Sequence, residues 1–207
     1  MHISKALPLP QSKNVRFLFG CETDLSKDLQ IGISPQRFDL FDFIIIPTTH
    51  LHFHGFTIAQ QDALDFERRA RLWAERLESV LNMNLPFYKI GIPHLTCKLM
   101  AGRGASKEDY FEVLKRLPLK EAERLFKKAA KLGVGIELNA DDIKYFEGEN
   151  KELCLRPYQI AKECKCKFYL GSDAHYPISF DTCRKYFNFA IDLLQLEETD
   201  KFEIRDR

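Results

Sequence analysis

The sequence predicts an α/β fold in which parallel strands alternate with helices. Short, almost continuously apolar runs recur along the chain, and such runs are typical of parallel strands buried on both faces. Longer stretches with apolar residues at helical spacing separate them. This alternation predicts crossover connections within one sheet. At 207 residues the chain suits one domain with a substantial core, so we expect residues 1–207 to form a single domain.

Five apolar runs are the predicted strands. They are residues 16–20, 42–47, 87–93, 133–138 and 167–171. A closed barrel of eight strands needs about 250 residues. Five strand–helix units in a shorter chain therefore predict either an open sheet or a β/α barrel that is small or lacks part of its N-terminal side.

Four amphipathic stretches are the predicted helices. They are residues 60–85, 119–132, 156–164 and 181–196. The pattern is clear in the second stretch, where Ala122, Leu125 and Ala129 share one face. Gly133 follows this stretch at a position where helices commonly end.

Composition and charge narrow the classes of function. The formal net charge is +1, which gives no general electrostatic attraction to nucleic acid or to a membrane surface. No apolar stretch approaches the roughly 20 residues that span a bilayer. The N-terminus lacks the pattern of a signal peptide, so we expect a cytoplasmic protein with neither a membrane nor a nucleic-acid partner. Cys164 and Cys166 are spaced too closely for a zinc knuckle, and we expect reduced, mostly buried thiols.

Histidines and carboxylates gather where the predicted strands end. These residues, with one neighbouring amide, are Glu22, His50, His52, His54, His94, Glu137, Asn139, Asp173 and His175. The C-terminal ends of parallel strands meet on one face, where β/α barrels build their active sites. Imidazole and carboxylate groups on such a face predict a metal site.

The segment Gly-Ser-Asp-Ala-His, residues 171–175, is the strongest single element. Asp173 and His175 are two positions apart at a strand end, so both side chains reach toward the same side and one metal cluster. The alternative is an aspartate that caps the next helix and a histidine that only packs. The other clusters make the metal interpretation the better one.

The densest cluster is His50, His52 and His54, whose period-two spacing places the imidazoles on one side of an extended segment. His50 is nearest the strand and is the preferred ligand. The other two are ligands, substrate contacts or neither. His94 follows Ile92-Pro93, which favours an extended strand end; the alternative is a core histidine bonded to a backbone carbonyl.

Four further polar residues have both a functional and a structural interpretation. Glu22 offers two oxygens that can bridge two cations, or it is a solvated turn residue. Glu137 and Asn139 point toward the strand-end face, or Glu137 forms a buried ion pair. Arg103 lies between two glycines, and its guanidinium can form a bidentate hydrogen bond with phosphate; the alternative is a solvated loop arginine.

Taken in order, these segments resemble the PHP (polymerase and histidinol phosphatase) family of metal-dependent phosphoesterases. The matching pieces are Gly20-Cys21-Glu22, the runs that end at His50 and at His94, residues 136–139 and residues 171–175. The resemblance spans residues 17 to about 195, and the ordered set is more specific than any one motif. It implies a distorted, TIM-like β/α barrel of seven strands that holds two or three divalent metal ions, usually zinc, manganese or iron.

The resemblance also implies metal-binding roles for individual residues. Glu22 corresponds to a bridging carboxylate, His50 and His94 to ligands of the second metal, Asp173 to a ligand of the first and His175 to a ligand of the third. The family opens with a His-x-His pair, whereas here only His2 precedes Glu22 and corresponds at most to half of that pair. We therefore expect a barrel that is incomplete at its N-terminus, as in a truncated form of a longer chain.

The function implied is that of a phosphatase that hydrolyses a small phosphomonoester, such as histidinol phosphate, with a metal-activated hydroxide. The expected catalytic residues are Asp173, His175 and His52, and the expected substrate contacts are Arg103, His54 and Asn139. One alternative is a nuclease or phosphodiesterase that uses the same cluster. Another is a degenerate domain that serves as a non-catalytic binding or structural module. The exposed edge of an incomplete barrel also favours a homo-oligomer.

Overall fold

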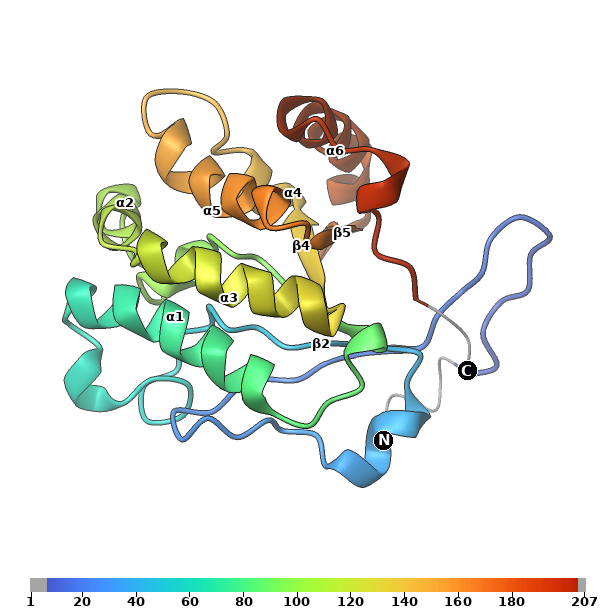
Figure 1. The fold of residues 1–207 in the computed structure, drawn as a ribbon, viewed down its shortest axis with the longest axis horizontal. Helices are drawn as coiled ribbons and strands as arrows, with labels where there is room; N and C mark the ends of the chain where they lie inside the picture. The colour runs from blue at the N-terminus through green and yellow to red at the C-terminus, as the bar shows by residue number, and fades with distance from the viewer. Residues whose placement is uncertain (1–6, 205–207) are drawn as a thin grey trace.

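Five parallel strands form one sheet whose spatial order follows the order of the chain (Figure 1). In the computed structural model, which describes residues 7–204, the strands are β1 (Gly20–Glu22), β2 (Phe43–Ile45), β3 (Ile90–Ile92), β4 (Gly135–Asn139) and β5 (Lys167–Gly171). Each strand pairs in parallel with the next, so their C-terminal ends lie on one side. The predicted α/β fold with a parallel sheet is confirmed, and within the described residues the sheet is open, with β1 and β5 at its edges.

Helices pack against this sheet. The α-helices of the described residues are α1 (Phe66–Asn82), α2 (Lys107–Lys115), α3 (Leu119–Leu132), α4 (Ala140–Ile143), α5 (Lys151–Glu163) and α6 (Phe180–Leu194). Short 3-10 helices are η2 (Pro35–Leu40), η3 (Gln60–Asp62), η4 (Phe87–Lys89), η5 (Lys98–Met100), η6 (Pro177–Ser179) and η7 (Glu198–Asp200). Helices α1, α3 and α5 lie side by side over one face of the sheet (Figure 1).

The first strand differs from its prediction. Residues 16–20 were expected to form it, but the ladder begins with Gly20 opposite Phe43 and continues to Glu22. The side chain of Asp42 accepts a hydrogen bond of 2.7 Å from the backbone N–H of Phe19, and the N–H of Asp42 donates to the Phe19 carbonyl at 2.8 Å. These bonds set the start of pairing just after Phe19. Glu22 is therefore the last residue of the strand rather than a residue beyond it.

The helices also differ from the predicted ranges, and α5, expected over residues 156–164, already begins at Lys151. Helix α1 starts at Phe66 because Asp65 caps it, accepting a hydrogen bond of 3.1 Å from the N–H of Arg68. Helix α2 was not predicted, although its sequence contains a capping box in which Ser106 and Asp109 bond each other's backbone N–H. By contrast, α3 spans the predicted residues 119–132 and ends at Gly133 with φ of 74°.

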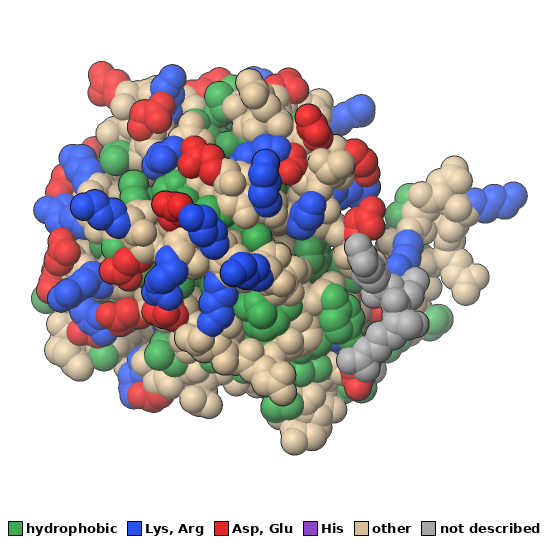
Figure 2. Space-filling view, in the orientation of Figure 1, with side chains coloured by type: hydrophobic (Ala, Val, Ile, Leu, Met, Phe, Trp, Pro, Cys, Tyr) green, Lys and Arg blue, Asp and Glu red, His purple; other side chains and the backbone are tan. Residues whose placement is uncertain are grey.

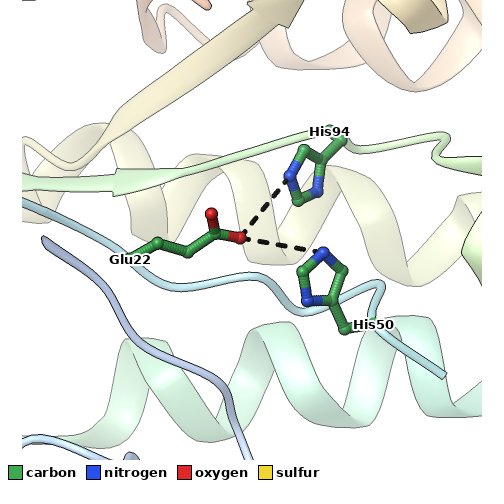
Figure 3. Close-up of side chains that lie close together, drawn as sticks. All are labelled: Glu22, His50 and His94. Atoms are coloured by element: carbon green, nitrogen blue, oxygen red, sulfur yellow. Dashed lines mark ion pairs between the residues drawn. The ribbon is translucent and has the colours of Figure 1, made fainter. Parts of the chain in front are cut away.

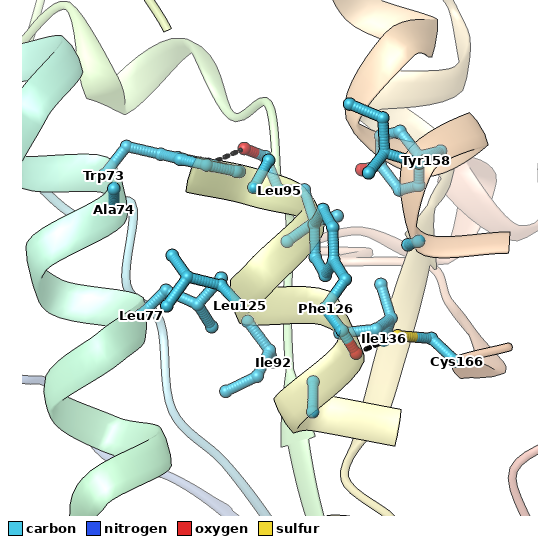
Figure 4. Close-up of a cluster of buried hydrophobic side chains, with 14 of the residues drawn as sticks. Trp73, Ala74, Leu77, Ile92, Leu95, Leu125, Phe126, Ile136, Tyr158 and Cys166 are labelled. Atoms are coloured by element: carbon cyan, nitrogen blue, oxygen red, sulfur yellow. Dashed lines mark hydrogen bonds between the residues drawn. The ribbon is translucent and has the colours of Figure 1, made fainter. Parts of the chain in front are cut away.

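The core between the sheet and helices α1, α3 and α5 is continuous (Figure 4). Trp73 of α1 and Phe126 of α3 are fully buried and meet edge to face, with ring centroids 6.1 Å apart. The indole N–H of Trp73 donates to the carbonyl of Leu95 at 2.9 Å, which satisfies a polar atom that burial would otherwise leave unpaired. This bond also ties α1 to the residue that follows His94.

Two buried arginines of α1 hold the loop that follows β2. Arg76 donates from Nε to the carbonyl of Thr48 at 2.7 Å, and Arg69 donates from Nη1 to the carbonyl of Leu51 at 2.8 Å. Each side chain is 1% exposed and is satisfied by backbone carbonyls. The backbone on both sides of His50 is thereby fixed to α1.

Aromatic side chains cover the other face of the sheet. The rings of Phe43 and Tyr169 meet at a centroid distance of 5.1 Å, and Phe202 lies 6.0 Å from Phe43. A Cβ atom at Gly91 would lie 2.6 Å from both Phe43 Cζ and Tyr169 Oη. Glycine at this position of β3 therefore makes room for the two rings.

The outer surface over α1 and α3 carries lysine, arginine and acidic side chains intermingled rather than a field of one sign (Figure 2). Arg124 of α3 and Glu78 of α1, for example, form an ion pair of 2.6 Å. Among the described residues, no helix combines the length and the apolar character needed to cross a membrane. All six cysteines are free thiols, and Cys154, Cys166 and Cys183 are buried.

Candidate metal centre

Three side chains from neighbouring strands converge at the C-terminal side of the sheet. Glu22 ends β1, and His50 and His94 lie in the loops after β2 and β3. Oε1 of Glu22 is 3.8 Å from Nε2 of His50 and 4.0 Å from Nε2 of His94 (Figure 3). One ligand atom from each residue lies within 4.8 Å of the other two. Three of the residues predicted to bind metal are thus brought together.

The hydroxyl group of Thr49 determines which nitrogen of His94 carries the proton. Thr49 Oγ1 donates its single hydrogen to the carbonyl oxygen of His94 at 3.0 Å. The same oxygen lies 3.3 Å from Nδ1 of His94, so there it accepts a hydrogen bond from Nδ1–H. The Nε2 atom of the neutral ring therefore presents its lone pair to Glu22.

Asp24 has the same effect on His50. Its Oδ1 atom lies 2.9 Å from Nδ1 of His50, and an ionised carboxylate only accepts hydrogen bonds. Nδ1 of His50 therefore carries a proton, and in the neutral ring Nε2 faces Glu22 with its lone pair. The rings of His50 and His94 stack at a centroid distance of 5.0 Å and an angle of 12°, so their planes are nearly parallel.

This arrangement fits a cation. Three electron-pair donors face one another, and with Nδ1 protonated no hydrogen atom lies between them. The distances of 3.8 and 4.0 Å are too long for hydrogen bonds and are about twice the metal–ligand distance of roughly 2.0–2.2 Å. A carboxylate that holds a histidine by Nδ1 while Nε2 faces the metal position is a common outer-shell feature of metal sites.

Burial keeps His94 in the form that binds metals. His94 is 5% exposed, and burial, assisted by the neighbouring His50, lowers its pKa to about 3. Burial also raises the pKa of the Glu22 carboxyl, although the field of His50 opposes this shift and the charge of Asp173 adds to it. A neutral imidazole is available without competition from protons near neutral pH.

Glu137 holds the backbone of His94. Its Oε2 atom accepts hydrogen bonds from the N–H of His94 at 2.9 Å and from the side-chain amide of Asn139 at 3.1 Å. Burial raises the pKa of Glu137 to about 8, against the effect of these two bonds. The strand-end interpretation of Glu137 is therefore supported over a buried ion pair. His94 has φ of 36°, a left-handed conformation that costs about 1–3 kcal/mol unless its surroundings impose it.

Asp173 and His175 follow β5, which is the edge strand at the opposite end of the sheet from β1 and Glu22. Nε2 of His175 is 3.4 Å from Oδ1 of Asp173. Burial raises the pKa of Asp173, while His175 and His50 lower it. Asp173 is thus within electrostatic reach of the Glu22–His50–His94 group but is not part of it, and His175 is largely exposed. Asp173 has φ of 46°, a second strained backbone at the site.

The remaining predicted residues occupy different positions. His52 packs edge to face on His50 at 5.1 Å, and its pKa is lowered by burial, by His50 and in part by Arg103. His54 is exposed and forms a backbone bridge with Ile58. His2 lies outside the described residues.

Asn139 is 1% exposed and uses its amide within the fold. Its nitrogen donates to Glu137 as described above, and its oxygen caps α4 by accepting from the N–H of Asp141 at 2.8 Å. A direct contact between Asn139 and a substrate stays a prediction.

Two residues around the centre were not predicted. Asp24 lies two positions after Glu22 in a polar stretch, and Thr49 directly precedes His50. The only available signal was their proximity to predicted ligands, because a carboxylate and a hydroxyl are the usual partners of a ligating histidine. No protein-family model matches the sequence, and no curated protein shows significant sequence similarity to it.

Proposed function

We propose that the protein is a PHP-like, metal-dependent phosphoesterase that hydrolyses a small phosphomonoester. The observation that carries the proposal is the meeting of Glu22, His50 and His94, with both histidine Nε2 lone pairs directed at the carboxylate. The resemblance of the ordered strand-end motifs to the PHP family supports the reaction class. The consecutive parallel order of the strands is compatible with our further proposal that the open sheet is the larger part of a TIM-like barrel.

Glu22, His50 and His94 would hold one divalent cation, and the electrostatic interaction of Asp173 with Glu22 favours a role for Asp173 in a second position. Such a cation supplies a Lewis acid for a phosphoryl oxygen and lowers the pKa of water. Asp24 and Thr49 orient the two histidines, and Glu137 fixes the backbone of His94. Arg103 is close enough for its charge to affect His52, which favours a role in attracting the phosphate.

A small monoester fits the charge distribution better than a nucleic acid. The formal net charge is +1, and acidic and basic side chains alternate over the face in Figure 2. Binding of a polynucleotide draws on many lysine and arginine contacts to phosphates. Arg103, whose charge acts on His52, instead suits one phosphate group.

The function can be tested by metal analysis followed by hydrolysis assays. Purified protein would be loaded with zinc or manganese and assayed with 4-nitrophenyl phosphate and with bis(4-nitrophenyl) phosphate. We expect hydrolysis of the monoester in preference to the diester, and loss of at least about 100-fold in kcat/KM in Glu22→Gln. Preference for the diester would favour a phosphodiesterase. Bound metal without hydrolysis of either ester would indicate a non-catalytic module.

A further inference from the structure

A cavity of about 280 Å³ lies beside Asp173, between α4 and α6. Its walls come from α4 and the residue that follows it, from the loop after β5, and from one face of α6. Asp173 and His175 line it, so the cavity adjoins residues of the candidate site. Cys183 and Ala140, which are 6% and 4% exposed, also line it, so part of the wall is formed by the packed core.

Apart from Asp173 and His175, the polar groups of the cavity suit a neutral, hydrogen-bonding ligand. Lys144 and Asp141 neutralise each other through an ion pair of 2.7 Å. Ser172 Oγ accepts from the N–H of Ala174 at 3.3 Å, which leaves its hydrogen free to donate. Thr182 Oγ1 donates its hydrogen to the carbonyl of Ser179 at 3.4 Å, which leaves its lone pairs free to accept. Donor and acceptor positions therefore both line the cavity.

The size of the cavity limits the ligand. Its volume of about 280 Å³ holds about nine waters at roughly 30 Å³ each. Drug-sized ligands occupy pockets of about 300–1,000 Å³, so this cavity suits a smaller molecule. The neutralised Lys144–Asp141 pair offers no unpaired charge for a second phosphate.

We propose that this cavity binds the alcohol part of the substrate, and that this part is a compact polyol. The inference rests on the proposed function, since the phosphate would occupy the Glu22–His50–His94 group and the alcohol would extend past Asp173 into the cavity. Asp173 lines the cavity and also interacts electrostatically with His50, so it stands between the two regions. The hydroxyl groups of a polyol satisfy the free donor of Ser172 and the free acceptor of Thr182.

Binding of sorbitol 6-phosphate to the full chain, with and without zinc, tests the proposal by ligand-observed nuclear magnetic resonance. Thr182→Trp fills the cavity from an exposed position on α6, and Asn188→Trp places the same ring at an exposed position of α6 outside the cavity. We expect wild type and Asn188→Trp to bind equally, and Thr182→Trp to bind at least about tenfold more weakly. Thr182→Val, which keeps the size and removes the acceptor, should weaken binding about threefold.

Equal binding by wild type and Thr182→Trp, or no binding by wild type, would overturn the proposal. If Thr182→Trp does not fold, equal binding by Thr182→Val and wild type would overturn it instead. Failure of the proposed function has a different signature, because no phosphomonoester would then be hydrolysed by the metal-loaded wild type. Hydrolysis of 4-nitrophenyl phosphate together with unchanged polyol binding in the variants would reject the cavity and leave the function standing.

Discussion

Oδ1 of Asp24 lies 2.9 Å from Nδ1 of His50, and this contact decides which nitrogen of His50 is free to bind a metal ion. Because the carboxylate accepts, Nδ1 carries the proton and Nε2 faces Glu22. Thr49 imposes the same tautomer on His94 by a different route. Two residues that are not ligands, Asp24 and Thr49, thus place the proton on Nδ1 of both histidines and leave Nε2 free.

Removal of the Asp24 carboxylate should weaken metal binding. We expect Asp24→Leu to lower zinc affinity about 10- to 100-fold, because the orientation and tautomer of His50 are no longer fixed. Asp24→Asn keeps an acceptor oxygen, so its zinc affinity should fall less than that of Asp24→Leu. The measurement is a competition titration against a zinc chelator, with Asp28→Leu as a matched control in the same loop. Equal affinity in Asp24→Leu and in the control would contradict the assigned role.

Thr49→Val should affect both folding and metal binding. The change keeps the shape of the side chain but leaves Nδ1 and the carbonyl of buried His94 without their partner, which costs about 1–3 kcal/mol of unfolding free energy. Zinc affinity should fall as well, whereas Thr49→Ser should restore both. Urea unfolding and the chelator titration measure the two effects. A valine variant with wild-type zinc affinity would show that the hydroxyl does not set the tautomer.

Gly171 leaves room for Glu137, and a methyl group there should disturb His94. A Cβ atom at position 171 would lie 1.7 Å from Oε1 of Glu137. We expect Gly171→Ala to destabilise the fold by about 1–3 kcal/mol and to weaken metal binding, because the displaced carboxylate releases the N–H of His94. Gly20→Ala in β1, where the nearest atom is 3.3 Å away, is the milder control. The measurement is thermal unfolding. An equal loss of stability in Gly171→Ala and Gly20→Ala would contradict a specific contact between residue 171 and Glu137.

Asp142 should make stability depend on pH. Burial raises its pKa from 3.8 to about 6, against the hydrogen bonds from Tyr158 and Thr96. A pKa raised on folding means that the contribution is fully present below about pH 4 and is lost as the pH rises through about 6. The difference between the two pKa values corresponds to about 3 kcal/mol of unfolding free energy.

Asp142→Asn isolates this contribution. The hydroxyl of Tyr158 and the N–H of Thr96 both donate to Oδ2, at 2.6 and 3.1 Å, so one amide oxygen can accept both bonds. Relative to wild type, the variant should gain stability between about pH 4 and pH 8, as measured by urea unfolding. Tyr158→Phe removes a bond that favours the charged carboxylate and should move the transition to higher pH. A difference between Asp142→Asn and wild type that does not change with pH would rule out Asp142 as the titrating group.

The sequence was sufficient to predict the order of the strands and the meeting of Glu22, His50 and His94. The apolar runs located β2 to β5, and adjacent parallel strands necessarily place Glu22, His50 and His94 at the same side of the sheet. The start of β1 was missed because it depends on the side chain of Asp42, which is distant in the sequence. A pattern of apolar residues does not reveal such a contact. Helix α2 has only nine residues, so its capping box was a stronger signal than its periodicity.

The finer organisation of the site was beyond sequence reasoning. Asp24 acts through one hydrogen bond and Thr49 through two, and the bonds of Thr49 join residues 45 positions apart. His94 has a left-handed backbone and its N–H bonds to Glu137, which lies 43 positions away, so the residue type at position 94 does not predict this conformation. His54 was grouped with His50 by period-two spacing, but the segment is not extended, because Phe53 and Ile58 close a turn around Gly55.

The most direct test of the metal centre is the anomalous scattering of zinc in crystals of the zinc-loaded protein. We expect a zinc peak within about 2.0–2.2 Å of Nε2 of His50, Nε2 of His94 and a carboxylate oxygen of Glu22. A peak absent from this position at saturating zinc, or zinc bound through Nδ1 of either histidine, would contradict the centre described here.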